Sequence, residues 1–206
     1  MIKLFIGTAN LGKQKEIQDF ANRYGHKNFQ LLFPDDNTRL DVPETGTTYQ
    51  ANALLKATAY YDSINDGSLI YVGDDSGIII PSLGNEPGVL SKRWAGFEMS
   101  DEQILSYCLH KMTGLTKDSR RAVFETVIVA LKKPGEYATY TGDMSGHILD
   151  EPQYDVSLNG FPFRSTFWVD EVNRVWDDAV ALNTESRQGF LTNREKAFKK
   201  LFEEMK

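Results

Sequence analysis

The sequence is poor in the side chains that disulfide scaffolds and most zinc sites require. It contains a single cysteine, Cys108, among 206 residues, which excludes an internal disulfide framework and a Cys₄ zinc site. Its three histidines, His26, His110 and His147, share no ligand spacing, and no Ser/His/Asp or Cys/His pattern is present. A covalent mechanism is therefore not indicated, and we expect Cys108 to be a small buried hydrophobic residue in an amphipathic helix.

Long apolar runs and excess positive charge are also missing. The longest apolar runs, such as Ile78–Ile80, are far shorter than the roughly 18 residues that span a membrane. Met1–Lys3 leads directly into a strand-like run, without the apolar region of a signal peptide. The 29 acidic and 23 basic residues give a net charge of −6, whereas binding to duplex nucleic acid needs a basic surface. We therefore expect a cytoplasmic protein that binds neither membranes nor nucleic acid.

The apolar pattern predicts an α/β fold. A buried strand at Ile2–Ile6 is followed by a helix from Leu11 to the residue before Gly25, an opening typical of an α/β unit. Further strands are predicted at 29–33, 68–72, 123–131, 137–144 and 166–169, and further helices at 100–109 and 192–205. A long helix is also predicted to run from a cap at Thr47 or Thr48 to about Ile64. The segment 84–97 is interrupted by glycine and proline and is predicted to be a loop. No repeat or long linker divides the chain, so we expect one domain over residues 1–206, with two lobes.

The first candidate for chemistry is the segment Gly7–Lys13, where a strand ends and a helix opens. The start of a helix offers free backbone N–H groups and the positive end of the helix dipole, and Lys13 adds a full charge. These are the components of a phosphate site, although the spacing of a Walker A motif is missing. The alternative is an ordinary capped helix with an exposed lysine.

The second candidate is Gly73–Gly77, which carries the adjacent carboxylates Asp74 and Asp75 after an apolar strand. Mg²⁺ prefers a few carboxylates completed by substrate phosphate oxygens and water, and a carboxylate can also activate a water molecule. The alternative is an Asp-rich turn that follows the strand and bonds its own backbone.

Three further residues are candidates for the same site only when they are considered together with the first two segments. Asn52 and Lys56 are four residues apart and therefore share one face of the long helix. Glu44, just before that helix, is a candidate third metal carboxylate, and Lys56 a second phosphate-binding cation. Taken alone, these three side chains are typical of an ordinary surface.

The last candidate lies in the final third of the chain. Arg194 stands at the start of the last helix, where a cation opposes the helix dipole, so we expect an anion or a base carbonyl near it. Phe161 and Phe163 lie in a Gly/Pro loop from which they are able to stack on a nucleobase. Aromatic residues in loops nevertheless usually pack on the core.

The order of these segments resembles that of the inosine triphosphate pyrophosphatase family, the Ham1-like pyrophosphatases of deaminated purine nucleoside triphosphates. The matching segments are Thr8–Lys13 (T-x-N-x-x-K), Glu44–Gly46 with Ala51–Ala57 (E-T-G…E-N-A-x-x-K-A), Asp74–Ile78 (D-D-S-G-L) and Pro87–Trp94 (P-G-x-Y-S-A-R-[YF]). The base-reading motifs depart: Phe161–Ser165 stands for F-G-[YW]-D-P, Thr192–Arg194 for S-H-R, and Gln188 for a lysine.

The resemblance implies a fold and an activity. The fold is mixed α/β, with an elongated, twisted central sheet flanked by helices and with two lobes around a cleft. The activity is hydrolysis of ITP, XTP or dITP to nucleoside monophosphate and pyrophosphate, and the family commonly forms homodimers, with the loop 84–97 as a plausible place of contact. Two alternatives stay open: the same chemistry on a different modified base, and a nucleotide-binding protein without catalysis.

The resemblance also implies a role for each matching residue. The catalytic residues are Asp75, Lys56 and Lys13, and Glu44, Asp75 and Asp74 bind Mg²⁺. The substrate-binding residues are Thr8, Asn10, Lys13, Asn52, Lys56, Ser76, Phe161, Phe163, Arg164, Gln188, Asn193 and Arg194.

Overall fold

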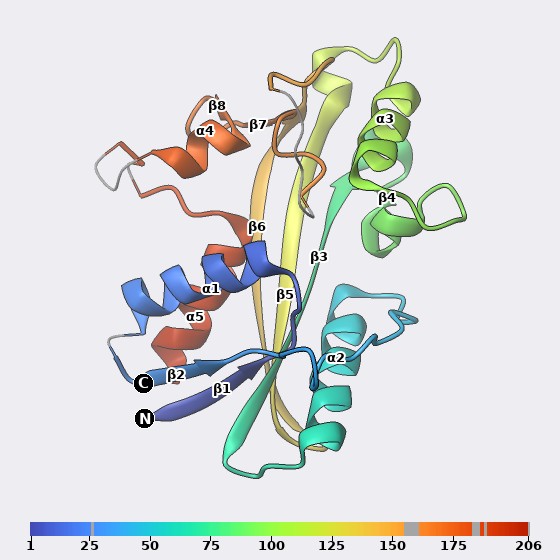
Figure 1. The fold of residues 1–206 in the computed structure, drawn as a ribbon. Helices are drawn as coiled ribbons and strands as arrows, with labels where there is room; N and C mark the ends of the chain where they lie inside the picture. Colours follow the sequence, from blue (N-terminus) through green and yellow to red (C-terminus); the bar gives the residue numbers. More distant parts are fainter. Residues whose placement is uncertain (26, 155–160, 183–185, 188, 206) are drawn as a thin grey trace. The chain divides into compact units, whose positions relative to one another are not determined.

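The chain forms two compact units in the computed structural model, which describes residues 1–25, 27–154, 161–182, 186–187 and 189–205 (Figure 1). Unit 1 comprises Met1–Ser76, Thr126–Gly142 and Asn193–Lys206. Unit 2 comprises Gly77–Glu125 and Asp143–Thr192. The cleft expected between the lobes stays a prediction.

The described strands form one mixed sheet in the order β2-β1-β3-β5-β6-β7-β8, with β4 paired to β3. They are β1 (Ile2–Ile6), β2 (Phe29–Leu32), β3 (Leu69–Ile80), β4 (Glu86–Pro87), β5 (Arg121–Lys133), β6 (Glu136–Ile148), β7 (Phe167–Val169) and β8 (Arg174–Val175). Strand β1 pairs in parallel with β2 and β3, whereas β4 runs antiparallel to β3 and β7 antiparallel to β6 and β8.

The sheet is flanked by five α-helices in the described ranges. They are α1 (Leu11–Tyr24), α2 (Tyr49–Ile64), α3 (Asp101–Lys111), α4 (Trp176–Ala181) and α5 (Asn193–Glu204). Three 3₁₀ helices, η1 (Pro81–Leu83), η2 (Gly88–Arg93) and η3 (Lys117–Arg120), lie between β3 and β5 along the chain. The predicted mixed α/β fold with a twisted, helix-flanked central sheet is confirmed. Within these ranges, no helix combines the length and the apolar composition that crossing a membrane requires.

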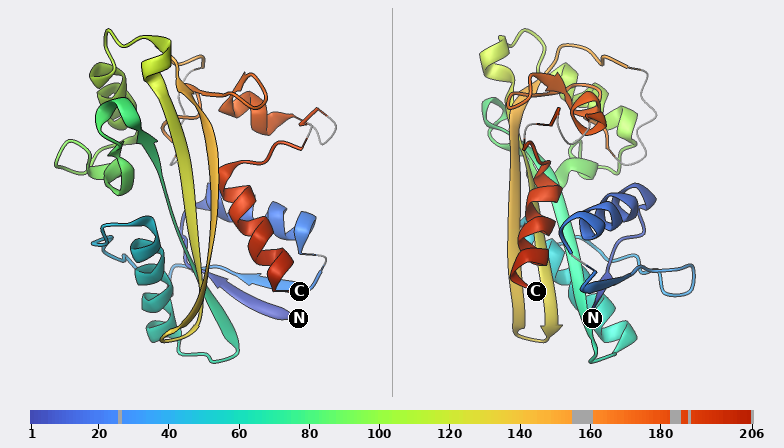
Figure 2. Two further views of the ribbon diagram at one scale, coloured as in Figure 1. Left: turned by 180° about the vertical axis from the view of Figure 1, so that it is seen from behind. Right: turned by 90° about the vertical axis from the view of Figure 1, so that its left-hand side faces the viewer.

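Unit 1 has three layers: α1 and α5, the sheet, and α2. Successive strand residues point to opposite faces of the sheet, so the strands have apolar side chains for the helices on both faces. In β1, Leu4 and Ile6 pack with α1 and α5, while Phe5 packs with α2. In β5, Ile128 joins the α1 and α5 side and Val129 the α2 side. Figure 2 shows α1 and α5 side by side on one face of the strands and α2 on the other.

The helices begin where polar caps in the sequence place them. The Asn10 side chain accepts the Lys13 backbone N–H of α1 at 3.0 Å, and Thr48 caps α2 in the same way. Ser100 and Gln103 form a reciprocal capping box at the start of α3. These caps confirm the predicted starts of three helices.

Unit 2 is built around an aromatic core. The Phe124 ring lies 5.7 Å from the Phe163 ring, 4.8 Å from Phe167 and 4.7 Å from Trp176, measured between ring centroids. Cys108 of α3 lies in the same core, and burial raises the pKa of its thiol to about 12. The prediction of a buried cysteine in a helix is therefore confirmed.

Two local predictions were wrong. Strand β3 does not end at Val72, because it continues from Leu69 to Ile80 and carries Asp74 and Asp75 within it. The apolar residues Ile78–Ile80 extend the strand, so the acidic pair stands in regular β structure rather than in a turn. The segment 84–97 is not all loop, since it contains β4 and η2.

Gly73 explains how a helix can approach the acidic part of β3. A Cβ atom at this position would lie 1.9 Å from the Ala53 carbonyl oxygen and 3.0 Å from the Ala57 nitrogen, both in the backbone of α2. Helix α2 therefore lies directly against β3 at Gly73. The contact sets the height of α2, and of the side chains it carries, above the strand.

We expect Gly73→Ala to lower the free energy of unfolding by about 3 kcal/mol, because overpacking typically costs about 1–3 kcal/mol and here the obstacle is backbone. Urea denaturation measures the change. Gly67→Ala is the matched control, since a Cβ atom there meets nothing within 4 Å. Equal stability of the two variants would contradict a tight contact between α2 and β3.

Candidate active site

The predicted phosphate and metal residues come together in unit 1, where α1, α2, β3 and α5 meet. The first of them lie at the turn from β1 into α1. The Thr8 hydroxyl accepts the backbone N–H of Asn10 at 3.3 Å, and Asn10 in turn caps α1. This fixed turn directs Lys13, in the first turn of the helix, towards β3.

Asp74 is the buried anion around which the cations gather. Its Oδ2 atom lies 2.9 Å from Nζ of Lys13 and 3.5 Å from Nε of Arg194, and the side chain is 2% exposed. Lys56 donates to the backbone oxygen of Asp74 at 2.9 Å. Burial alone would raise the pKa of Asp74, but Lys13, Arg194 and Lys56 together hold this pKa far below its usual range. The pKa of Lys13 is lowered as well, because its burial outweighs the attraction of Asp74.

Asp75 faces the opposite side of β3, as strand alternation requires. Its Oδ2 atom accepts from Nδ2 of Asn52 at 2.9 Å, and its Oδ1 atom lies 3.6 Å from Nζ of Lys56. Burial raises the pKa of Asp75, and this effect exceeds the opposing attraction of Lys56. Two adjacent aspartates thus have opposite properties: Asp74 is a firmly ionised counter-ion, and Asp75 is a carboxylate with raised proton affinity.

Lys56 joins Asp75 to Glu44. Its Nζ atom lies 2.7 Å from Oε1 of Glu44, and Asn52, one helical turn earlier, also accepts the Gly46 N–H at 2.8 Å. Burial would lower the pKa of Lys56, but the carboxylates of Asp75, Asp74 and Glu44 raise it. The loop before α2 is therefore tied to the helix on which the lysine stands.

The donor set fits a magnesium ion that takes most of its ligands from elsewhere. The carboxylates of Glu44 and Asp75 converge on the Lys56 ammonium, which marks a point attractive to a cation. Among the described residues, no group of three or more His, Cys, Asp or Glu side chains is placed to hold a metal. Asp74, the third predicted ligand, is engaged by Lys13 and Arg194. Two carboxylates completed by phosphate oxygens and water are a usual environment for Mg²⁺.

The start of α5 brings the predicted residues Asn193 and Arg194 to the same cluster. Asn193 donates to the Thr126 hydroxyl at 2.8 Å, and this hydroxyl lies 2.9 Å from that of Ser76. Arg194 donates from Nη2 to Ser76 at 3.3 Å and from Nη1 to Glu16 at 2.8 Å. The expectation of an anion near Arg194 is met by two carboxylates of the protein itself.

Thr126 and Glu16 belong to this cluster, but the sequence analysis missed both. Glu16 follows Lys13 by three residues and so shares its helix face, which was a readable signal. Thr126 is a fully buried hydroxyl inside an apolar strand, and such a group requires a partner. Its partners come from β3 and α5, which the sequence does not indicate.

The residues expected to read the base lie mostly in unit 2. The Arg164 guanidinium lies 4.0 Å from the centroid of the Phe161 ring, and its Nη1 atom lies 3.7 Å from Oδ1 of Asp177. Phe163 is 3% exposed, so its ring contributes to the core. Gln188 lies outside the described residues. The base-binding roles of Phe161, Arg164 and Gln188 stay predictions.

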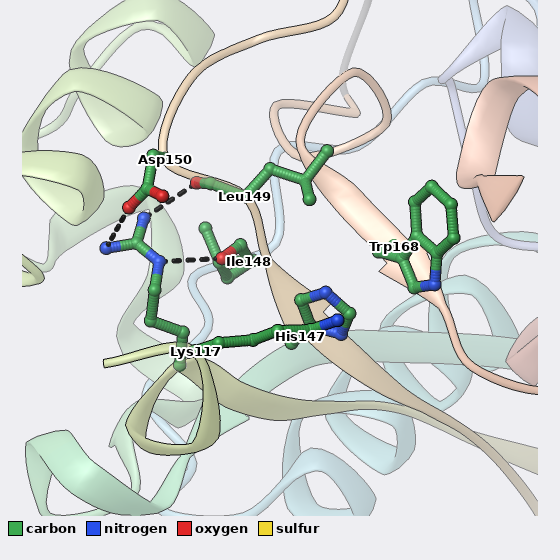
Figure 3. A pocket seen from close by; sticks show the side chains of 7 residues that line it. Lys117, His147, Ile148, Leu149, Asp150 and Trp168 are labelled. Atoms are coloured by element: carbon green, nitrogen blue, oxygen red, sulfur yellow. Dashed lines mark hydrogen bonds and ion pairs between the residues drawn. The ribbon is translucent and has the colours of Figure 1, made fainter. Parts of the chain in front are cut away.

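Unit 2 also contains a pocket of about 230 Å³ (Figure 3). It is lined by Lys117, Arg120, His147, Ile148, Leu149, Asp150 and Trp168, none of which is a predicted site residue. The Arg120 guanidinium donates to the carbonyl oxygens of Ile148 at 2.8 Å and Leu149 at 2.7 Å, and is thereby used to fasten the end of β6. The pocket is distinct from the charged cluster in unit 1.

The chain is similar to known proteins over nearly its whole length. A family model described as the Ham1 family matches residues 4–204. This chain belongs to the Ham1 family. A relative from Photobacterium profundum, named dITP/XTP pyrophosphatase, is 33% identical over 209 residues, covering 100% of this chain and 99% of the relative. A protein of the same name from Bacillus subtilis is 31% identical and covers 98% of this chain and 96% of its own length.

Solved structures of the Ham1 family share the fold. The Staphylococcus aureus Ham1 protein matches with a TM-score of 0.75 and 29% identity, over 98% of this chain and 97% of its own. A HAM1 protein from Coxiella burnetii matches with a TM-score of 0.81 and 24% identity, over 100% of this chain and 98% of its own. The likeness therefore includes both units.

We expect Asp74→Asn to lower the free energy of unfolding at pH 7 by about 3 kcal/mol, because it leaves Lys13 and Arg194 without their shared counter-ion. The native pKa of Asp74 is lowered, so its contribution is complete above the unfolded pKa of about 3.9 and is lost as the pH falls towards the native value. The difference in free energy of unfolding between the wild type and Asp74→Asn should therefore become smaller below about pH 4. Urea denaturation at pH 7 and pH 3 measures it, and equal stability at pH 7 would contradict the role of Asp74.

Proposed function

We propose that this protein hydrolyses deaminated nucleoside triphosphates such as ITP, XTP and dITP to nucleoside monophosphate and pyrophosphate. One observation carries the proposal: the half-buried Lys13 and Lys56 lie beside the adjacent carboxylates Asp74 and Asp75, on the segments that match the Ham1 motifs. The relatives named dITP/XTP pyrophosphatase, which cover almost the whole chain, support the choice of substrate. A cytoplasmic location stays a prediction from the sequence.

The cations of unit 1 are proposed to bind the triphosphate. Lys13 and Lys56 reach the cluster from two different helices, so they are able to hold separate phosphate oxygens. The free N–H groups at the start of α1, beside Thr8 and Asn10, add the positive end of a helix dipole. In the absence of substrate the lysines are held by Asp74, Asp75 and Glu44 and are thereby kept in position.

Asp75 is proposed to activate the water that attacks the α-phosphorus. A new bond forms from the water oxygen to the α-phosphorus, the bond to the bridging oxygen breaks, and pyrophosphate leaves. The water proton passes to the Asp75 carboxylate, which acts as the general base. The hydrogen bond from Asn52 fixes the carboxylate for this role.

Glu44 and Asp75 are proposed to hold Mg²⁺, as their convergence on Lys56 suggests. The ion would supply charge neutralisation for the phosphate oxygens. The hydroxyl groups of Ser76 and Thr126 are hydrogen-bonded to each other and join β3 to β5, and Asn193 joins α5 to them.

The base preference follows from weaker indications. Arg164 stands where the family motif has a carboxylate. This difference favours, as the second candidate function, the same hydrolysis of a nucleoside triphosphate that carries a different modified base. We propose that Phe161, Arg164, Gln188, Asn193 and Arg194 contribute to base recognition, whereas the expected role of Phe163 is wrong because its ring is buried in the core of unit 2.

The proposed function predicts Mg²⁺-dependent release of pyrophosphate with selectivity for ITP, XTP and dITP over the four common triphosphates. A coupled pyrophosphate assay over that panel, extended by several modified bases and repeated with EDTA, measures it. Activity centred on another base would keep the chemistry and reassign the substrate. No turnover with any of them would indicate a nucleotide-binding protein.

Within the same assay, Asp75→Asn should reduce kcat by about 10²–10³-fold, as is typical when a group that stabilises the transition state is lost. The fold should be retained. Asp62→Asn, an exposed substitution on α2, is the matched control and should be fully active. Wild-type turnover in Asp75→Asn would contradict its role as the base.

We also propose a homodimer formed through the segment 84–97 of unit 2. Leu90 and Phe97 are 51% and 57% exposed there, and a second copy of the chain would cover these two large apolar side chains. Light scattering should give about twice the mass of 23.3 kDa for the wild type and the single-chain mass for the double variant Leu90→Ser, Phe97→Ser. A monomeric wild type would contradict the proposal.

A further inference from the structure

We propose that Glu16 is a positioning residue for the substrate site: its carboxylate fixes the Arg194 guanidinium against β3, in the orientation that binds substrate. This inference rests on the proposed function. Glu16 matters through Arg194 and does not itself contact the substrate.

The geometry shows a guanidinium held at three of its nitrogen atoms. Nη1 donates to Oε2 of Glu16 at 2.8 Å, Nη2 donates to Oγ of Ser76 at 3.3 Å, and Nε lies 3.5 Å from Oδ2 of Asp74. The Arg194 side chain is 6% exposed. Glu16 supplies the shortest of the three contacts and the only one that comes from α1.

The surrounding charges explain why this contact is needed. Arg194 stands at the start of α5, where the helix dipole is unfavourable for a cation, and it shares Asp74 with Lys13. Glu16 gives Arg194 a carboxylate that Lys13 does not share. Arginine also has many rotamers, so holding it in one orientation before substrate arrives removes an entropic cost from binding.

The same two helices offer a built-in comparison. Near the other end of α1, Arg23 forms an ion pair with Glu195 of α5, and the Tyr24 hydroxyl donates to Glu195 at 2.8 Å. Both contacts therefore join α1 to α5, which lie side by side in Figures 1 and 2, but only the contact of Glu16 reaches Asp74 and Ser76. If Glu16 served only to hold α1 against α5, loss of the Arg23 contact would raise KM as much as loss of the Glu16 contact.

The experiment compares KM and kcat for wild type, Glu16→Ala, Glu16→Gln and the matched control Arg23→Gln, on the best substrate of the panel. We expect Glu16→Ala to raise KM by about 10–100-fold with kcat little changed, as for a lost charge-assisted hydrogen bond. Glu16→Gln, which keeps an accepting oxygen, should recover part of the loss. Arg23→Gln should keep the wild-type KM and lose only thermal stability.

A double-mutant cycle completes the test. In an Arg194→Ala background, Glu16→Ala should change KM no further, because its partner is already absent. An unchanged KM in Glu16→Ala, an equal effect of Arg23→Gln, or additive effects in the cycle would each overturn the inference. A wild type without any turnover would instead overturn the proposed function, and this inference with it.

Discussion

The ion cluster around Asp74 is the interaction on which the rest of the site depends. A buried carboxylate in the middle of a strand is costly unless it is paired, and here Lys13 and Arg194 pair with it from α1 and α5. The pairing fixes where the first turns of α1 and α5 lie on the sheet. It also leaves the neighbouring Asp75, on the opposite face of β3, to a separate set of partners from α2. Strand β3 thus carries two carboxylates in different environments, because successive side chains of a strand point to opposite faces of the sheet.

Close backbone contacts bring these charges within hydrogen-bonding distance. Gly73 lets α2 rest on β3, and Gly142 does the same for α5 on β6, since a Cβ atom there would lie 2.1 Å from the Asn193 carbonyl oxygen. Lys56 and Arg194 stand on these two helices. A helix displaced outward by one methyl group would move its cation away from Asp74 and Asp75. The positions of the charges therefore depend on two residues that carry no chemistry themselves.

The sequence predicted the parts of this site that are local. It predicted that α1 begins at Leu11 and that Thr47 or Thr48 caps α2, and helical spacing places Asn52 and Lys56 on one face. The acidic pair was recognised, but its surroundings were not, because a Gly-Asp-Asp-Ser-Gly segment has the composition of a turn and becomes strand only through pairing with other strands. Thr126 was not recognised as part of the site for the same reason, because its hydrogen-bond partners come from elements that meet it only in the folded chain.

The balance of charge in the cluster bears on the proposed reaction. Three cations and four carboxylates lie within it: Lys13, Lys56, Arg194, Asp74, Asp75, Glu44 and Glu16. Such a set has no net positive charge with which to attract a triphosphate, so attraction alone does not explain binding. The lysines have to exchange carboxylate partners for phosphate oxygens, and the released carboxylates then need another cation. A divalent metal that arrives with the triphosphate meets that need, which is why the same arrangement favours both a phosphate substrate and a requirement for Mg²⁺.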